Sequence, residues 1–155
     1  MDTADTADSA GIAGMQALPV RRTVLYVEDN PVNYQLVEQL LERRDDLRLL
    51  PAPNASTGIA LARSFLPEVI LMDINLPGIS GYDALQILHE SAATAHIPVI
   101  ALSAQAMPRE IERGLAAGFF GYLTKPIRID LFMDALDVAL LHAQQHRAAG
   151  SPASA

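Results

Sequence analysis

Three acidic residues follow two apolar segments that have the composition of buried strands. Asp73 comes directly after the run 69–72, and Glu28 and Asp29 come directly after 23–27. Because the carboxyl ends of parallel strands meet at one edge of a sheet, we expect the three carboxylates to converge there. Converging carboxylates repel one another unless a cation compensates their charge. The sequence therefore predicts a cation site at this edge.

A hydroxyl and an ammonium group occupy two further strand ends. Ser103 follows the apolar run 99–102, and Lys125 follows the run 121–124. Carboxylate oxygens suit Mg²⁺, which keeps several waters and readily takes phosphate oxygens. Lys125 could neutralise a phosphoryl oxygen, and Ser103 could donate a hydrogen bond to another. Asp73, ionised at neutral pH, could then attack phosphorus without a general base and form an acyl phosphate.

The segments that must position these groups alternate between strand and helix patterns. Short connections between alternating strands and helices predict an α/β fold, a parallel sheet with helices on both faces. The predicted strands are 23–27, 47–50, 69–73, 99–102 and 121–124. The first predicted helix begins at Pro31, and the others cover 55–65, 81–91, 108–117 and 129–145.

Local signals define the first helix better than the second strand. Asn30 can cap the helix that begins with Pro31. Pro51 and Pro53 follow 47–50 and leave the end of that strand open. In the first helix, Val32, Leu36 and Leu40 recur at helical spacing, with Val37 and Leu41 beside them.

Composition limits the organisation of the chain and its partners. The 155 residues are 50% hydrophobic, enough for one domain with a sizeable core. We expect an ordered domain over 21–146, with disordered tails over 1–20 and 147–155. The net charge of −7 argues against nucleic-acid binding and against attachment to an anionic membrane.

Two absences in the sequence indicate the compartment. The chain has no cysteine, which excludes disulfides and thiolate metal sites. It has no apolar stretch approaching the ~20 residues that span a bilayer and no secretory signal pattern at its start. We therefore expect a cytoplasmic protein.

Four segments together resemble the receiver domain of two-component response regulators. They are VLYVEDN at 24–30, ILMDINLPG at 70–78, ALSA at 101–104 and YLTKP at 122–126, in the order and at the spacing of that family. The segments 28–33, 104–108 and 114–120 further resemble receivers at the carboxyl end of hybrid sensor histidine kinases. The resemblance implies a five-stranded parallel sheet in the (βα)5, flavodoxin-like receiver fold.

The resemblance also implies roles for the metal and phosphoryl ligands. Asp73 matches the phosphoacceptor. Glu28, Asp29 and Asp73 match the residues that hold Mg²⁺, with the backbone carbonyl of Asn75 as a further ligand.

Three other positions match the switching machinery of the family. Ser103 matches the hydroxyl that turns toward the phosphoryl group, and Tyr122 matches the aromatic residue that moves with it. Lys125 matches the lysine that contacts the phosphoryl group, and its peptide bond to Pro126 is expected to be cis.

Partners follow from the same resemblance. A sensor histidine kinase or a histidine phosphotransfer protein would donate the phosphoryl group. The aspartyl phosphate would then shift an equilibrium at the face formed by 108–117, 121–124 and 129–145. That face would bind a downstream protein target or join two copies as a homodimer. Both a free-standing phosphate shuttle and a piece of a hybrid kinase fit the sequence. In either case the domain would not be an enzyme in the usual sense, because it would catalyse only its own phosphotransfer and autodephosphorylation.

Two other functions compete with a signalling receiver. A haloacid-dehalogenase-like phosphohydrolase also uses a strand-end aspartate, Mg²⁺, a hydroxyl residue and a lysine. It needs a second acid two residues after the nucleophile, where this chain has Asn75. An interaction module that never takes phosphate would not need the acidic set and the lysine together.

Overall fold

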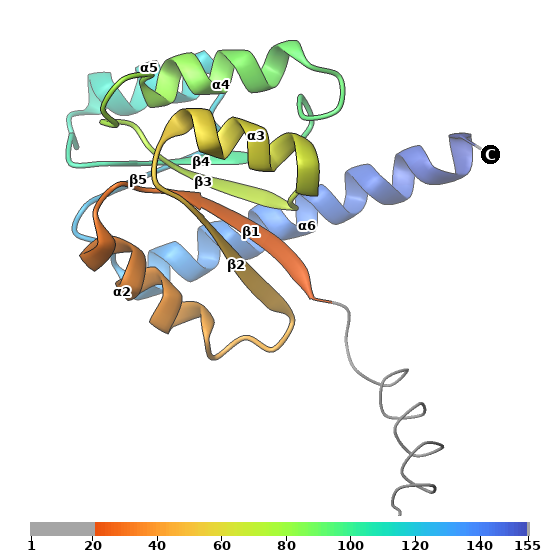
Figure 1. The fold of residues 1–155 in the computed structure, drawn as a ribbon, viewed down its shortest axis with the longest axis horizontal. Helices are drawn as coiled ribbons and strands as arrows, with labels where there is room; N and C mark the ends of the chain where they lie inside the picture. The colour runs from red at the N-terminus through yellow and green to blue at the C-terminus, as the bar shows by residue number, and fades with distance from the viewer. Residues whose placement is uncertain (1–20, 155) are drawn as a thin grey trace, which may run out of the picture.

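The structure, a computed structural model, describes the backbone of residues 21–154 and the side chains of 21–146 (Figure 1). Its five strands form one parallel sheet in the order β2-β1-β3-β4-β5, which confirms the predicted fold class. The elements along the chain are β1 (Arg22–Val27), α2 (Pro31–Leu41), β2 (Leu47–Ala52), α3 (Ala55–Phe65), β3 (Val69–Asp73), α4 (Gly81–Glu90), β4 (Val99–Ser103), α5 (Pro108–Ala117), β5 (Gly121–Thr124) and α6 (Ile129–Ser154).

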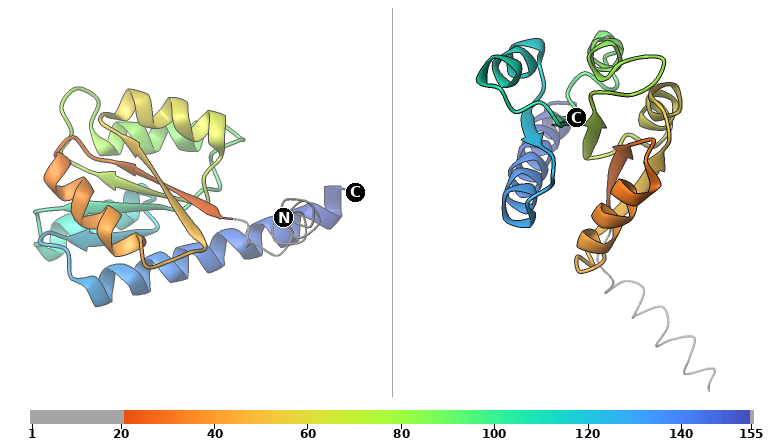
Figure 2. Two further views of the ribbon diagram at one scale, coloured as in Figure 1. Left: turned by 60° about the horizontal axis from the view of Figure 1, so that its bottom comes forward. Right: turned by 90° about the vertical axis from the view of Figure 1, so that its left-hand side faces the viewer.

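The helices cover both faces of the sheet. α2 and α6 lie on one face, and α3, α4 and α5 lie on the other (Figures 1 and 2). The central strands β3 and β4 are buried along their whole length, because helices exclude water from both of their faces. The sheet therefore separates two cores, one centred on Leu25, Ile70 and Leu85 and the other on Tyr26, Leu71 and Phe132.

β2 continues through the proline that made its end uncertain in the sequence. Pro51 pairs with Tyr26 of β1, and the strand ends at Ala52. The carbonyl of Ala52 accepts a hydrogen bond from the backbone N–H of Glu28 at 2.9 Å. Backbone groups alternate sides along a strand, so the nitrogen of Pro51 lies on the free edge, where no N–H donor is needed.

The apolar residues that indicated α2 in the sequence are buried only in part. Val37 and Leu41 are buried against the sheet, but Val32 is 70% exposed and Leu36 is 41% exposed. A helix resting on a sheet buries a limited stripe. With Val37 and Leu41 in that stripe, Val32 and Leu36 are turned toward solvent. Asn30 caps the helix as predicted, accepting a hydrogen bond from the backbone N–H of Val32 at 2.9 Å.

α6 is longer than the segment 129–145 predicted from sequence. The helix continues to Ser154, so the backbone of 147–154, predicted as a disordered tail, is helical. The run 143–149 is rich in residues of high helix propensity, which favours this continuation. The predicted tail over 1–20 lies outside the described residues, and the limits 21–146 of the ordered domain stay a prediction. Within the described part of the chain, no helix combines the length and apolar character required to cross a bilayer.

An ion-pair network ties the loop before β2 to two other elements. Asp46 accepts hydrogen bonds from Arg44 at 2.9 and 3.0 Å and from Arg22 of β1 at 3.1 Å. Arg44 also donates to Asp137 of α6 at 2.9 Å. The hydrogen bonds from Arg44 lower the pKa of Asp46 well below its ordinary value, against the opposing effect of burial, and Arg22 lowers it further.

We predict that Asp46→Asn lowers the free energy of unfolding near pH 7 by about 1 kcal/mol, since the network is partly exposed. The folded-state pKa of Asp46 lies below its unfolded value. Its contribution is therefore present above about pH 4 and is lost as the pH falls toward the depressed pKa. Urea unfolding near pH 7 and near pH 3 measures this, with the exposed neighbour Asp45→Asn as the control. An equal loss at both pH values would contradict the assignment.

Candidate functional site

The register of the sheet brings the predicted polar residues to one edge. Glu28 follows β1, Asp73 ends β3, Ser103 ends β4 and Lys125 follows β5. All four therefore lie at the carboxyl ends of neighbouring strands. The parallel pairs that set this level are Val27 with Met72, Asp73 with Leu102, and Ser103 with Thr124.

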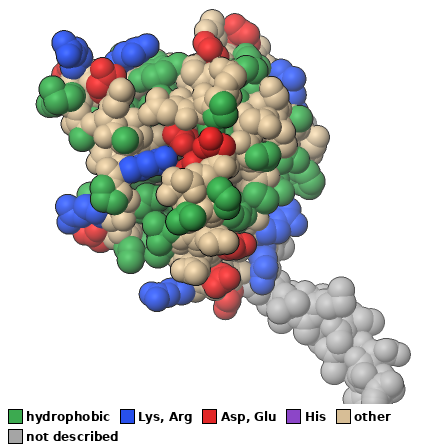
Figure 3. Space-filling model, turned by 60° about the vertical axis from the view of Figure 1, so that its left-hand side comes forward, with side chains coloured by type: hydrophobic (Ala, Val, Ile, Leu, Met, Phe, Trp, Pro, Cys, Tyr) green, Lys and Arg blue, Asp and Glu red, His purple; other side chains and the backbone are tan. Residues whose placement is uncertain are grey.

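The three predicted acids form one cluster. Glu28, Asp29 and Asp73 each offer a carboxylate oxygen, and these oxygens lie within 4.8 Å of one another. Glu28 and Asp73 are buried, at 6% and 4% exposure, whereas Asp29 is exposed. Figure 3 shows acidic side chains gathered beside a basic one on the corresponding face of the molecule. The cluster is therefore anchored in the protein and open to solvent on one side.

Lys125 lies against the two buried carboxylates. Its Nζ is 3.2 Å from Oδ2 of Asp73 and 3.4 Å from Oε1 of Glu28. Burial alone would lower the pKa of the Lys125 ammonium, but the charges of Asp73 and Glu28, with their hydrogen bonds, outweigh it and raise the pKa. Lys125 is therefore a permanent positive charge at neutral pH.

Glu28 is held by two donors besides Lys125. Its Oε1 accepts from the Tyr26 hydroxyl at 2.9 Å, and its Oε2 accepts from the backbone N–H of Asn30 at 3.3 Å. Burial raises the pKa of Glu28, and the Asp73 carboxylate raises it further, while Tyr26 and Lys125 oppose this. Sequence reasoning missed Tyr26, although a residue two positions before Glu28 on a strand shares its side of the sheet.

The Asp73 carboxylate is oriented by its own loop. Oδ1 accepts a hydrogen bond from the backbone N–H of Asn75 at 3.0 Å, and Oδ2 faces Lys125. The role predicted for the carbonyl of Asn75 stays a prediction. Gly81, the first residue of α4, packs so closely that a Cβ there would lie 2.9 Å from the Asp73 carbonyl oxygen and 2.8 Å from Cα of Ile74. Glycine at this position lets α4 begin directly beside the end of β3.

Both predicted switch residues bind the backbone of Gln105. The buried Ser103 accepts from the N–H of Gln105 at 3.0 Å, and the Tyr122 hydroxyl donates to the carbonyl of Gln105 at 3.1 Å. Sequence reasoning missed Gln105, because backbone groups carry no residue-type signal. The backbone N–H of Lys125 donates to the Ser103 carbonyl at 2.7 Å, and the Lys125–Pro126 peptide is cis, as predicted.

The donor set fits a hard divalent cation. The cluster has three carboxylates, and Lys125 pairs with two of them, which leaves negative charge to be compensated. Oxygen ligands at an open site are the arrangement that Mg²⁺ prefers, because it retains water and accepts further oxygens. Among the residues that the structure describes, this is the cluster of acidic or histidine side chains that could hold a metal.

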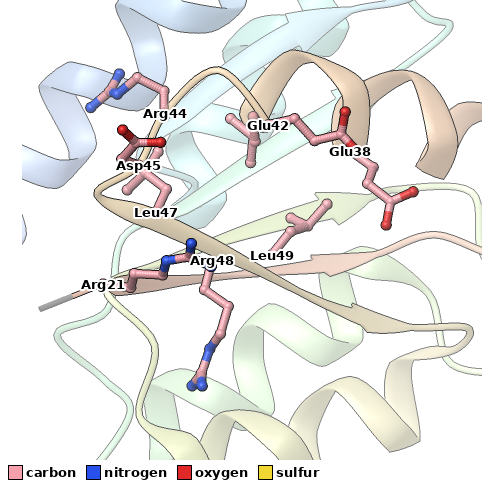
Figure 4. Close-up of a pocket in the computed structure, with 9 residues that line it drawn as sticks. Arg21, Glu38, Glu42, Arg44, Asp45, Leu47, Arg48 and Leu49 are labelled. Carbon is pink, nitrogen blue, oxygen red and sulfur yellow. The ribbon is translucent and has the colours of Figure 1, made fainter. Parts of the chain in front are cut away.

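A separate cavity of about 320 Å³ lies at the opposite ends of β1 and β2 (Figure 4). It is lined by charged residues of both signs, and the side chains of Arg44 and Arg48 point apart. Arg44 is already bound to Asp46 and Asp137, and Arg48 donates to Thr23 at 3.1 Å. The groups do not converge on one point, so the cavity carries no comparable chemistry.

Comparisons with known proteins agree on one family. The model of the response regulator receiver domain matches residues 24–137. The polar-differentiation response regulator DivK of Brucella anthropi is 36% identical over 115 residues, which are 74% of this chain and 93% of DivK. PilH of Pseudomonas aeruginosa is 33% identical over 117 residues, which are 76% of this chain and 96% of PilH.

A solved structure supports the same relation. The receiver domain of the sensor histidine kinase PA1611 from Pseudomonas aeruginosa superposes with a TM-score of 0.71 at 30% identity, covering 78% of this chain and 98% of that one. That structure has a magnesium ion coordinated in its active-site cleft. The matches thus include proteins of about receiver length and a receiver taken from a sensor kinase.

Proposed function

The chain belongs to the response regulator receiver family, and from this premise we propose that Asp73 accepts a phosphoryl group in a two-component phosphorelay. Such a domain acts in signalling rather than as a classical enzyme. The observation that carries the proposal is the Asp73 carboxylate, with acidic oxygens within 4.8 Å and the Lys125 ammonium at 3.2 Å.

The groups that this chain contributes to the chemical step lie at the strand ends. A carboxylate oxygen of Asp73 attacks the phosphorus of a phosphohistidine on the donor protein. The new O–P bond makes an acyl phosphate, and the N–P bond breaks with its electron pair left on the imidazole. Lys125 moves from the carboxylate to a phosphoryl oxygen, and Ser103 donates its hydroxyl hydrogen to another.

Magnesium would be held by Glu28, Asp29, Asp73 and the backbone carbonyl of Asn75. When bound, the metal supplies positive charge next to the phosphoryl oxygens. The burial of Glu28 and Asp73 supports this assignment, since buried carboxylates require compensation. The exposed Asp29 leaves the site open to water and to the donor.

We predict that Asp29→Ala lowers the affinity for Mg²⁺ at least about tenfold, because one of few charged oxygens is lost. The concentration of Mg²⁺ needed for half-maximal phosphorylation should rise accordingly, while Asp73 stays in place. A Mg²⁺ titration of the labelling rate measures this, with Asp45→Ala as the control for an exposed acid elsewhere. A titration equal to that of the wild type would remove Asp29 from the metal site.

The surface around the site suits a protein donor. Val32 and Leu36 of α2 are exposed beside the acidic segment, and Met107, four residues after Ser103, is 60% exposed. Hydrophobic side chains surround the acidic patch in Figure 3. Exposed apolar groups around a polar centre are typical of protein-binding surfaces. We propose a sensor histidine kinase or a histidine phosphotransfer protein as the donor.

The output surface is proposed to be the face of α5, β5 and α6. Tyr122 links this face to the site through Gln105, and Leu115 of α5 is exposed on it. A downstream protein target or a second copy of the chain would bind there. A cytoplasmic location is part of this proposal, because the donor and the target must both reach the domain.

The test is phosphorylation by acetyl phosphate, with and without Mg²⁺. We expect one acid-stable, hydroxylamine-sensitive phosphoryl group per chain, formed only with the metal. Sustained release of phosphate from small phosphate esters would instead indicate a phosphohydrolase, for which Asn75 stands where a second acid is needed. Absence of labelling with intact Mg²⁺ binding would indicate an interaction module.

A further inference from the structure

We infer that Gly114 of α5 is a positioning residue whose missing side chain provides the space for the ring of Tyr122. The inference rests on the proposed function in one respect, since it assigns Gly114 a part in the regulation of the same site. It does not depend on which protein donates the phosphoryl group.

The ring of Tyr122 packs so closely against Gly114 that a side chain at position 114 would not fit. A Cβ on Gly114 would lie 2.6 Å from Cδ2 and 2.8 Å from Cε2 of Tyr122, and 3.6 Å from the hydroxyl of Tyr82. The backbone of Gly114 is helical, and Gly114 is the buried residue of α5. Glycine weakens a helix interior and meets no conformational need there. The sequence therefore accepts this cost at a position where the helix contacts the ring.

The ring of Tyr122 is fixed at two points. Gly114 contacts its edge, and the carbonyl of Gln105 accepts its hydroxyl hydrogen at 3.1 Å. The N–H of the same Gln105 donates to Oγ of Ser103 at 3.0 Å. The position of α5 is therefore linked to the Ser103 hydroxyl through one aromatic ring and one peptide unit.

A second contact ties α5 to the start of α4. The guanidinium of Arg113 lies over the ring of Tyr82, 4.6 Å from its centroid. Tyr82 follows Gly81, which packs directly against the carbonyl of Asp73. Neighbouring residues of α5 thus contact two aromatic residues, Tyr82 at the start of α4 and Tyr122, which is linked to Ser103 through a peptide unit. α5 is therefore connected both to the start of α4 and to the backbone that holds Ser103.

We expect Gly114→Ala to displace the Tyr122 ring, because an aromatic ring can rotate about χ1 to relieve the clash. The hydrogen bond to Gln105 would then be lost, and the loop that holds Ser103 would loosen. Ser103 would reach a phosphoryl oxygen more easily. The affinity for beryllofluoride, a mimic of the phosphoryl group on an aspartate, should rise about fivefold, the effect of one net hydrogen bond.

The first measurement follows Tyr122 directly. The full chain is labelled with 3-fluorotyrosine, the ¹⁹F resonance of Tyr122 is assigned with Tyr122→Phe, and beryllofluoride is titrated with Mg²⁺. Gly114→Ala should move the Tyr122 resonance before any beryllofluoride is added and should tighten its binding. Ala116→Gly, on the exposed side of α5, changes helix propensity without touching the ring and should do neither. An unmoved resonance with unchanged affinity would overturn the inference.

The second measurement is a double-mutant cycle on unfolding. With Tyr122→Ala as background, Gly114→Ala should raise the equilibrium constant for folding about fourfold, the gain expected from helix propensity. With Tyr122 present, this gain should be absent. An equal gain in both backgrounds would show that the ring does not need the space. A Gly114→Ala protein that fails to fold, while the double variant folds, would support the clash.

The two proposals fail in different ways. A wild-type chain that takes neither beryllofluoride nor acetyl phosphate would end the proposed function. The resonance shift and the unfolding cycle would still decide whether Gly114 positions Tyr122, because neither needs a phosphoryl group. The converse result is a wild-type chain that is phosphorylated normally and a Gly114→Ala variant that changes neither the Tyr122 resonance nor the unfolding cycle. That result would refute only the role of the glycine.

Discussion

Asp73→Ala is expected to abolish phosphorylation by acetyl phosphate, a loss of at least about a thousandfold, as for other covalent nucleophiles. Asp73 is buried, its Oδ1 is oriented by the N–H of Asn75, and its Oδ2 faces Lys125. Glu28 is also buried and faces Lys125, but its Oε1 already accepts a hydrogen bond from the Tyr26 hydroxyl, and Asp29 is exposed. Intact-mass spectrometry after incubation with donor and Mg²⁺ measures the loss.

The control for this variant is Asp83→Ala, which removes an acid from the first turn of α4 away from the cluster. It should label at the wild-type rate. Circular dichroism of Asp73→Ala should show an intact fold, because removing one of three clustered carboxylates relieves repulsion. A phosphoryl group that persists on Asp73→Ala at an unchanged rate would place the nucleophile elsewhere.

Lys125→Ala is expected to slow phosphorylation by about a hundredfold or more, the cost of losing one charged stabiliser of a developing oxyanion. Binding of Mg²⁺ should be retained. The Lys125 ammonium lies 3.2 Å from Asp73 and 3.4 Å from Glu28, so it competes with a metal for the same carboxylates. Labelling rates and a Mg²⁺ titration of the same protein separate the two effects.

Lys125→Arg is the matched variant, because it keeps the charge but changes the geometry of the donors. We expect it to recover less than the full rate. A Lys125→Ala protein that is phosphorylated at the wild-type rate and still moves Tyr122 would contradict the assigned role. Loss of Mg²⁺ binding in that variant would show instead that the lysine supports the metal site.

The strands and the site edge could be predicted because they depend on simple patterns. β3 and β4 are apolar up to their last residues, since helices cover both faces, so their ends can be found in the sequence. Asp73 and Ser103 mark those ends, and parallel pairing then requires that they share one edge. The spatial cluster follows from topology without any knowledge of side-chain packing.

The face of α2 could not be predicted in the same way. Several apolar positions recur at helical spacing, and periodicity alone does not say which of them lie against the sheet. Burial of Val37 and Leu41 leaves Val32 and Leu36 exposed. Their exposure fits the donor-binding surface proposed above, because such a surface also needs apolar groups.

The contacts of Gln105 and Gly114 were beyond sequence reasoning for a different reason. Gln105 acts through its peptide groups, which every residue possesses. Gly114 acts through the absence of a side chain, and a glycine within a helix pattern is usually counted only as a weak helix former. Both contacts depend on where Tyr122 lies after the sheet and α5 have packed together.

The proline at the outer strand has a consequence for behaviour at high concentration. Sheets with free borders can recruit further strands, which leads to runaway polymerisation. At the β2 border, Pro51 withholds a hydrogen-bond donor from any incoming chain, as its nitrogen lies on the free side. Replacement of Pro51 by a residue with a backbone N–H would add a hydrogen-bond donor for the strand of another molecule. Pro51 therefore opposes fibril-like association of the protein at high concentration.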